Sequence, residues 1–232
     1  MNNPPPTHVF PTGQIRPNHT HTHPSASIVG IALFPKHAAM PRPRRILLAH
    51  QPHHIVQRGH RRQVVFERAS DYRAYLHDLH HHTVQLSVGL HAWCLMPNHV
   101  HLLLTPLDNP GSISKLMQHL ARGATRRWNA RKQTAGSLWE ARFKSRVVDE
   151  ERYLLECCRY IELNPIRTRL VESPANYPWS SYRERMGMAP VQMLHLHMLY
   201  VAMGSTDAAR REAYRAFVQA GIAQAGIGKP AT

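Results

Sequence analysis

The stretch "MPNHVHLLL" contains the residues best suited to chemistry, His99 and His101, which flank Val100 and precede an apolar run. If this stretch is a strand, its side chains alternate between faces, so the two imidazoles point the same way, roughly 7 Å apart along the chain. Val100, Leu102 and Leu104 then point into a core. Two imidazoles fixed on one open face can bind a single divalent cation.

Histidine pairs at this spacing are common in the chain, because it contains 19 histidines in 232 residues. The other pairs are His19/His21, His21/His23, His80/His82 and His195/His197. The first two lie in a Pro- and His-rich stretch without periodicity, and His80 and His82 diverge at the polar end of a helix. The pair at 195 and 197 alternates in "MLHLHML" but has no second functional group nearby. Spacing alone favours a structural role for any such pair, so the surrounding elements must decide.

A helix expected to begin near residues 149–150 holds the complementary groups. In "RYIELNP", Tyr160 and Asn164 are four residues apart and therefore share a helical face. They flank the stripe expected to be buried, namely Leu154, Cys157, Cys158 and Ile161. Pro165 is expected to end this helix at Asn164. A phenol and an amide oxygen beside two imidazoles would supply a nucleophile and a third ligand; the alternative is a half-buried core tyrosine and a helix-terminating asparagine.

Other tyrosines compete for the nucleophile's role. Tyr153 lies two helical turns before Tyr160 on nearly the same flank and is the best alternative. Tyr72 and Tyr75 belong to the apolar stripe of a helix capped by Ser70, so they are expected in the core. The neighbouring Asn164 favours Tyr160.

The elements that would position these groups alternate in type. We expect a strand ending at Gly59, a helix from Ser70, strands at 90–96 and 99–105 joined by Pro97-Asn98, a helix from Ser112, alternating residues at 142–146, and the helix ending at Asn164. This order predicts an α+β fold with a ferredoxin-like antiparallel sheet and helices on one face. The other face would be free for a site.

Charge points to a polyanionic partner, since 29 Lys+Arg against 14 Asp+Glu give a net charge of +15 and a pI near 10.6. Three basic clusters are expected to bind the phosphates of a nucleic-acid strand, with an aromatic ring available for base stacking. They are Arg58, Arg61 and Arg62; Arg122, Arg126, Arg127, Trp128, Arg131 and Lys132; and Arg142, Lys144 and Arg146. Any one of these residues could instead belong to a solvated basic helix end, and Trp128 could belong to the core.

Cysteine content, hydropathy and local composition predict the cellular compartment and the domain boundaries. Three cysteines, two of them adjacent, imply no disulfide framework, and neither a membrane span nor a signal peptide is evident, so a cytoplasmic protein is expected. Its positive charge adds the expectation that it is nucleoid-associated. Residues 1–39 are expected to be a disordered Pro/His-rich tail, with Met40 as a hypothetical natural start. Residues 40–185 would form the main domain, and 186–232 a basic helical C-terminal appendage.

These residues resemble a known family. "MPNHVHLLL", "YLLECCRYIELNPIRTRLV" and "YPWSSY" are similar to motifs of the HUH single-tyrosine transposases, and the closest subgroup is the REP-associated tyrosine transposases (IS200-like). The resemblance covers roughly residues 40–182. It implies that His99, His101 and Asn164 hold Mg²⁺ or Mn²⁺ and that Tyr160 attacks a DNA phosphate, leaving a 5′-phosphotyrosine.

The resemblance also implies the substrate, which would be single-stranded DNA hairpins of short palindromic repeats, bound by a monomer or a homodimer. A rival interpretation is a hairpin-binding protein that no longer cleaves. A replication or plasmid-transfer initiator is disfavoured, because the sequence offers only one suitable tyrosine and no helicase module.

Overall fold

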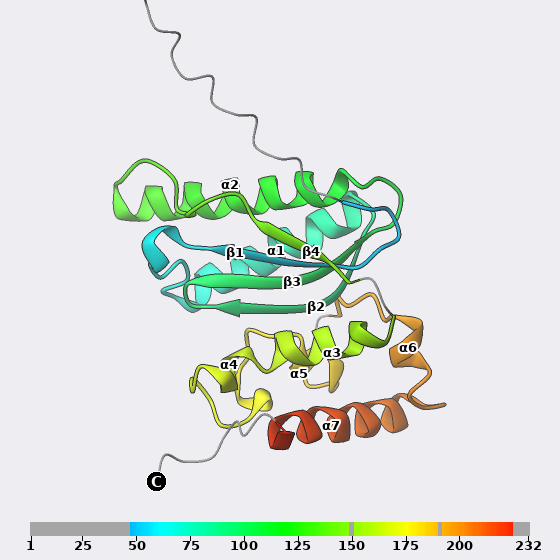
Figure 1. The fold of residues 1–232 in the computed structure, drawn as a ribbon. Helices are drawn as coiled ribbons and strands as arrows, with labels where there is room; N and C mark the ends of the chain where they lie inside the picture. Colours follow the sequence, from blue (N-terminus) through cyan, green and yellow to red (C-terminus); the bar gives the residue numbers. More distant parts are fainter. Residues whose placement is uncertain (1–46, 149–150, 190–191, 225–232) are drawn as a thin grey trace, which may run out of the picture. The chain divides into compact units, whose positions relative to one another are not determined.

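The computed structural model describes residues 47–148, 151–189 and 192–224 (Figure 1). The tail expected at 1–39, the hypothetical start at Met40 and the expected start of the third helix at 149–150 lie outside them. The first elements are β1 (His53–Arg58), the short helix η1 (His60–Arg62), α1 (Ala69–Gln85), β2 (Val88–Met96), β3 (His99–Pro106), α2 (Ser112–Lys132), β4 (Lys144–Val147) and α3 (Glu151–Glu162). They are followed by α4 (Asn164–Arg167), η2 (Pro174–Asn176), α5 (Tyr182–Arg185), α6 (Met198–Val201) and α7 (Asp207–Gln224).

The strands form a four-stranded antiparallel sheet in the order β2-β3-β1-β4. With α1 between β1 and β2, and α2 between β3 and β4, this is the ferredoxin-like α+β arrangement that the sequence predicts. The prediction of fold class is therefore confirmed. The alternating residues of "KSRV" form β4, the short strand that pairs with β1.

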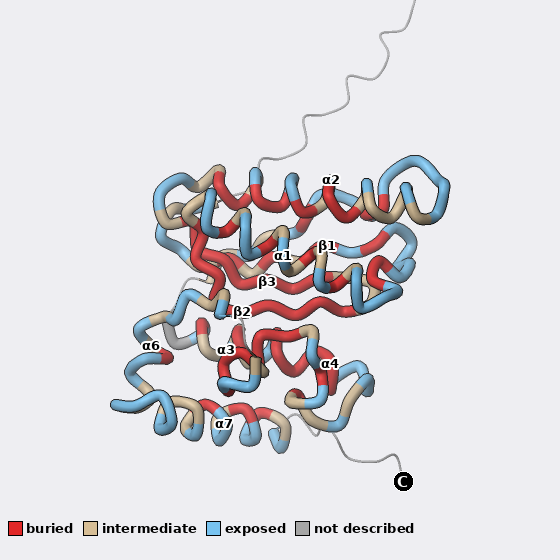
Figure 2. Tube along the Cα trace, turned by 180° about the vertical axis from the view of Figure 1, so that it is seen from behind, coloured by how far each residue is buried: buried red, intermediate tan, exposed pale blue. Residues whose placement is uncertain are grey.

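One face of the sheet carries the first core, beneath α1 and α2 (Figure 1). Val100, Leu102 and Leu104 are fully buried there, as the alternation along β3 predicts. Tyr72 and Tyr75 of α1 are also buried in this core, which removes them from the list of nucleophiles. The burial view shows the inward sides of both helices in red and their outward sides in blue (Figure 2).

The opposite face is covered only in part. α3 packs over β2 and β3, and its residues Leu154, Cys158 and Ile161 form a second core with Cys94 and Leu103 of the sheet. Cys157, which we expected in the buried stripe, is instead intermediate in exposure and lines a cavity. The β1 and β4 side of this face is left for a site.

The end of α3 differs from the prediction. α3 ends at Glu162, and a new short helix, α4, runs from Asn164 to Arg167 with Pro165 in its first turn. Proline is tolerated there because the first turn of a helix has no partner for its N–H group. Pro165 therefore marks the start of the next helix as well as the end of α3.

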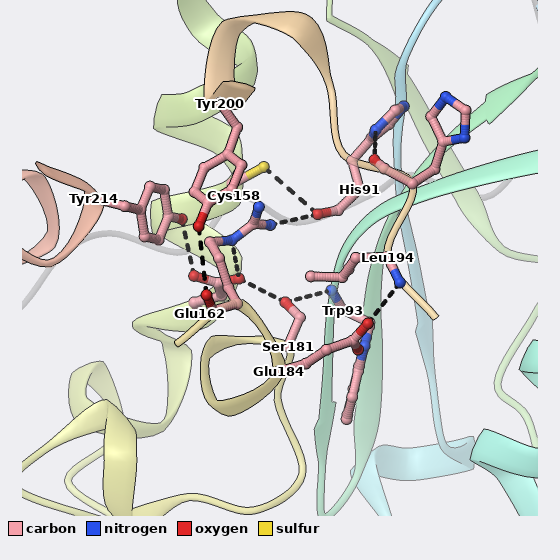
Figure 3. Close-up of polar contacts among 11 residues, drawn as sticks. His91, Trp93, Cys158, Glu162, Ser181, Glu184, Leu194, Tyr200 and Tyr214 are labelled. Atoms are coloured by element: carbon pink, nitrogen blue, oxygen red, sulfur yellow. Dashed lines mark hydrogen bonds and ion pairs between the residues drawn. The ribbon is translucent and has the colours of Figure 1, made fainter. Parts of the chain in front are cut away.

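A buried polar network ties α3 to the C-terminal helices (Figure 3). Glu162 is fully buried and accepts hydrogen bonds from Arg185 Nε at 3.1 Å, Ser181 Oγ at 2.6 Å and Tyr214 Oη at 2.8 Å. Arg185, whose side chain is 2% exposed, also donates to the carbonyl oxygen of His91 on β2 at 2.5 Å. The network fixes α3 against both β2 and α7, just two residues after Tyr160.

The outer edge of β2 is covered by segments from the C-terminal half of the chain. The backbone N–H of Leu95 donates to Trp179, Ser181 donates to Trp93, and His195 donates to Leu90. The 193–194 backbone is held in turn by the Glu184 carboxylate. Residues beyond 185 thus contribute to the main sheet's environment, and α7 lies within the C-terminal segment that was expected to be helical.

Candidate active site on the open face of the sheet

The histidine pair lies on the face of the sheet opposite α1 and α2. In the strand register, His101 is opposite Val56 and His99 is opposite Arg58 of β1. The ring centroids of His99 and His101 are 4.9 Å apart. Alternation along β3 therefore brings the two imidazoles together on one face, as the sequence analysis predicts.

A third histidine, His54 on β1, joins the pair. Its Nε2 atom is 2.9 Å from Nδ1 of His101, and the two rings stack with centroids 5.2 Å apart. His54 lies outside the motifs that the sequence offers. The alternation of β1 offered a signal, because His54 and Arg58 share a face of that strand, but the pairing of β1 with β3 was not visible in the sequence.

Burial keeps all three imidazoles neutral near pH 7. It lowers the pKa of His99 to about 4, with the nearby Arg58 charge adding to the effect. It lowers the pKa of His101 to about 3, where His99, His54 and Arg58 also contribute, and that of His54 to about 4, assisted by Arg146. A neutral imidazole retains a lone pair for a metal ion.

Tyr160 lies beside the histidines. Its ring centroid is 6.0 Å from that of His101 and 5.8 Å from that of His54, with both pairs edge-on. The residue is 41% exposed, which places the tyrosine at the surface of the cavity. The Arg167 guanidinium lies 5.1 Å from the centre of the Tyr160 ring, a contact that the sequence analysis missed because α4 was not expected.

The Asn164 side chain, at the start of α4, is hydrogen-bonded to the last turn of α3. Its Nδ2 atom donates to the carbonyl oxygens of Tyr160, at 2.9 Å, and Ile161, at 3.3 Å, and the residue is 7% exposed. The amide oxygen is the atom that remains for a ligand. Asn164 does not line the cavity that contains Tyr160 and His101, so its role as third ligand stays a prediction.

A basic cavity of about 1260 Å³ surrounds Tyr160 and His101. Its basic lining residues are Arg58, Arg142, Lys144, Arg146, Arg159 and Arg167. Lys144 is opposite Val56 and Arg146 is opposite His54, so β4 places both cations on the face that carries the histidines. One of the three basic clusters from the sequence analysis, together with Arg58, therefore lies at the site. Tyr153, the rival nucleophile, also lines this cavity.

The cluster on α2 lies outside the cavity lining, and three of its cations are paired with carboxylates. The pairs are Arg127 with Asp78, Arg131 with Asp71 and Glu67, and Lys132 with Glu67. Trp128 is half-buried and stacks beneath Arg131 and Lys132. Arg122 and Arg126 are exposed, as are Arg61 and Arg62 of η1. DNA binding by these residues stays a prediction.

The donor set fits a divalent cation in part. Two neutral imidazoles and an amide oxygen mix nitrogen and oxygen donors, which is compatible with Mg²⁺ or Mn²⁺ and less so with a thiol-seeking metal. Among the described residues, no three His, Cys, Asp or Glu side chains could together hold an ion. A cation at this site would need the oxygen donor or water besides the histidine pair.

Comparisons with known proteins decide the family. The family described as "Transposase IS200 like" matches residues 49–164, half of the chain, and that range contains both histidines, Tyr160 and Asn164. The chain belongs to the IS200-like transposase family. The resemblance recognised in the sequence is thereby confirmed.

Two similar proteins extend the comparison. A Haemophilus influenzae protein, provisionally named a REP-associated tyrosine transposase, is 26% identical over 100 residues, which cover 39% of this chain and 57% of the relative. The match thus spans little more than half of that relative's length. A solved structure described as a REP-associated tyrosine transposase bound to a REP hairpin has a TM-score of 0.55 at 17% identity, covering 65% of this chain and 89% of that one. This likeness supports the fold. Within residues 47–148, 151–189 and 192–224, every helix is too short or too polar to span a bilayer.

Proposed function

We propose that the protein is a metal-dependent single-stranded DNA endonuclease and strand transferase that acts on hairpins of palindromic repeats through a 5′-phosphotyrosine. The observation that supports this most directly is the contact of Tyr160 with His101, at 6.0 Å between ring centroids, within a basic cavity. Tyr160, the imidazoles of His101 and His54, and several basic side chains thus line the same cavity, and His99 lies beside His101 outside that lining. The hairpin substrate follows the relatives named REP-associated transposases.

In the proposed reaction, the Tyr160 phenol loses its proton and its oxygen attacks the phosphorus of a DNA phosphodiester. The new bond joins phosphorus to the tyrosine oxygen, and the bond from phosphorus to the 3′-oxygen breaks. That oxygen takes up a proton and becomes a free 3′-hydroxyl. The reverse reaction with the same or another 3′-hydroxyl rejoins strands, so no external energy source is needed.

The surrounding side chains would position the substrate. Arg146, Lys144 and Arg58 attract the DNA backbone on the face of the sheet that carries the histidines. Arg167, over the Tyr160 ring, is placed to offset the negative charge that develops on the attacked phosphate. His99, His101 and the oxygen of Asn164 would hold Mg²⁺ or Mn²⁺, which when bound supplies polarisation of the scissile phosphate.

The experiment uses labelled hairpin oligonucleotides taken from repeats of the protein's own genome. The full chain is incubated with each hairpin and Mn²⁺, and covalent protein–DNA adducts are separated on a denaturing gel. We expect an adduct with the wild type and none with Tyr160→Phe. Tyr153→Phe is the matched control, because Tyr153 lines the same cavity on the same helix, and this variant should still form the adduct.

Two outcomes would contradict the proposal. An adduct that persists in Tyr160→Phe and disappears in Tyr153→Phe would transfer the nucleophile's role to Tyr153. Tight binding of hairpins without an adduct under Mg²⁺ or Mn²⁺ would support the second candidate, a hairpin-binding protein without cleavage. The family match and the basic cavity are shared by both candidates, so the adduct is the deciding result.

A further inference from the structure

The hydrogen bonds behind the histidine pair involve the same ring nitrogen of each imidazole. Nδ1 of His99 is 2.6 Å from Oδ1 of Asn98, and Nδ1 of His101 is 2.9 Å from Nε2 of His54. Nε2 of His99 and Nε2 of His101 are thus left on the side away from these contacts. The same nitrogen is engaged in both rings, although the two supporting residues come from different elements, the β2–β3 turn and β1.

A second hydrogen bond of the Asn98 side chain determines which atom donates and which accepts in its contact with His99. Nδ2 of Asn98 donates to the carbonyl oxygen of Arg62 at 3.3 Å, and a carbonyl oxygen can only accept. The amide is therefore oriented with Oδ1 toward His99. Because that oxygen also only accepts, Nδ1 of His99 must carry the proton, and Nε2 of the neutral ring keeps the lone pair.

In the contact between His54 and His101, either imidazole could donate the hydrogen bond. The positions of the ring nitrogens nevertheless distinguish between two possible roles for His54. One role is that of a third ligand, and the other is support of His101. The described residues include no three His, Cys, Asp or Glu side chains positioned around one ion. Nε2 of His54 faces Nδ1 of His101 rather than its Nε2. Support of the ring is the role that this contact allows.

We propose that Asn98 and His54 are positioning residues, which hold the proton of His99 and of His101 on Nδ1 so that both Nε2 lone pairs face the site. Metal-ligating histidines commonly donate their other ring N–H to an acceptor in this way, which fixes both the tautomer and the ring orientation. The proposal rests on the proposed function for its purpose, since the free lone pairs would serve the cation. The protonation pattern itself can be measured without a metal.

The arrangement also connects the site to the arginine-bearing turn. Asn98 lies between His99 and the backbone of Arg62, and both Arg61 and Arg62 have left-handed backbone angles, with φ of 49° and 62°. Such angles are unusual for arginine and persist only where surrounding contacts maintain them. The hydrogen bond from Asn98 is one of these contacts. The same amide thus supports an imidazole and the conformation of a basic turn.

The first test is long-range ¹H–¹⁵N NMR of the metal-free, ¹⁵N-labelled full chain at pH 7.5. The ring signals are assigned by their loss in His99→Ala and His101→Ala. We expect both residues to be Nδ1–H tautomers, whereas exposed neutral histidines in water favour Nε2–H. An Nε2–H tautomer at either position would overturn the proposal for that residue, whatever the DNA chemistry of the protein.

The second test is Mn²⁺ affinity, measured by electron paramagnetic resonance of the unbound ion. Loss of such supporting contacts commonly weakens metal binding about 10- to 100-fold, so we expect this change in Asn98→Ala and in His54→Ala. Asn98→Asp and His54→Gln keep an acceptor and should restore most of the affinity. His60→Ala is the control, because His60 is exposed on the neighbouring turn. Thermal melting and hairpin binding in EDTA show whether each variant is folded.

The outcomes separate the two proposals. Correct tautomers with unchanged Mn²⁺ affinity in both alanine variants would overturn the positioning role and leave the proposed function intact. A wild-type protein that binds no Mn²⁺, or whose binding survives His99→Ala with His101→Ala, would contradict the metal dependence in the proposed function. The NMR result would still decide whether Asn98 and His54 set the protonation of the two rings.

Discussion

Replacing Arg185 by methionine should destabilise the protein strongly, because it would leave a buried carboxylate without its countercharge. Glu162 is 0% exposed, and the Arg185 side chain is 2% exposed, so neither charge is stabilised by water. Removing one partner of a buried ion pair costs about 3–5 kcal/mol. For an m value of about 2 kcal/mol per molar urea, the unfolding midpoint would fall by roughly 2 M.

The structure provides a matched control and an internal check for this prediction. Arg215 pairs with Glu212 at the surface, with side chains 44% and 69% exposed, so Arg215→Met should cost only about 0–1 kcal/mol. The double variant Glu162→Gln/Arg185→Met removes both buried charges and should cost less than the sum of the two single changes.

The assay is urea unfolding of the wild type, Arg185→Met, Glu162→Gln, the double variant and Arg215→Met, followed by circular dichroism. The reasoning would be refuted if Arg185→Met and Arg215→Met lowered the free energy of unfolding equally, or if the two buried changes were additive. A large, non-additive loss would mean that this pair holds α3, and with it Tyr160, against the sheet and α7.

Three further results are expected. Arg146→Gln should lower the slope of log affinity against log salt for hairpin binding by about 0.7, because Arg146 lines the cavity. Arg127→Gln should leave the slope unchanged, because Arg127 is already paired with Asp78. Equal slopes in the two variants would contradict a DNA contact by Arg146. Burial lowers the pKa of His91 from 6.5 to about 4, so the unfolded chain binds more protons than the folded one between these pH values. The free energy of unfolding should therefore fall by up to about 3 kcal/mol as the pH falls from 6.5 to 4. Urea unfolding at several pH values should show a smaller fall in His91→Gln. Gly59→Ala should lower the melting temperature, because its Cβ would lie 2.5 Å from the carbonyl oxygen of Gln63; an unchanged melting temperature would show that the turn adapts.

Sequence periodicity sufficed for the sheet and for the histidine pair, because alternation along β3 is local. His99, His101 and the core residues Leu102 and Leu104 follow from it directly. Tyr160 was placed by helical spacing combined with the family resemblance, and the structure brings its ring beside His101. The spacing of His99 and His101 along β3, and of Tyr160 and Asn164 along the chain, is local, whereas the approach of Tyr160 to His101 is a long-range contact.

The features that the sequence did not reveal depend on contacts between distant segments. His54 meets His101 only through the register of β1 with β3, and Arg167 reaches Tyr160 only because Pro165 starts a new helix rather than simply ending α3. The pairing of the α2 cations with carboxylates of α1 likewise depends on how two helices pack. A list of basic residues therefore predicts the net charge of a surface better than it predicts which cations are free.

The covering of the β2 edge by residues 179–181 and 195 has a consequence for shortened gene products. A chain ending between α4 and residue 179 would expose a nine-residue strand whose outer N–H and C=O groups lack these partners. Unprotected edges of this kind promote strand addition between molecules. Frameshifts or nonsense codons downstream of the histidine and tyrosine motifs would then yield insoluble, rapidly degraded protein rather than a smaller soluble one. Selection for solubility would thereby act on the C-terminal third of the gene even where no DNA is bound.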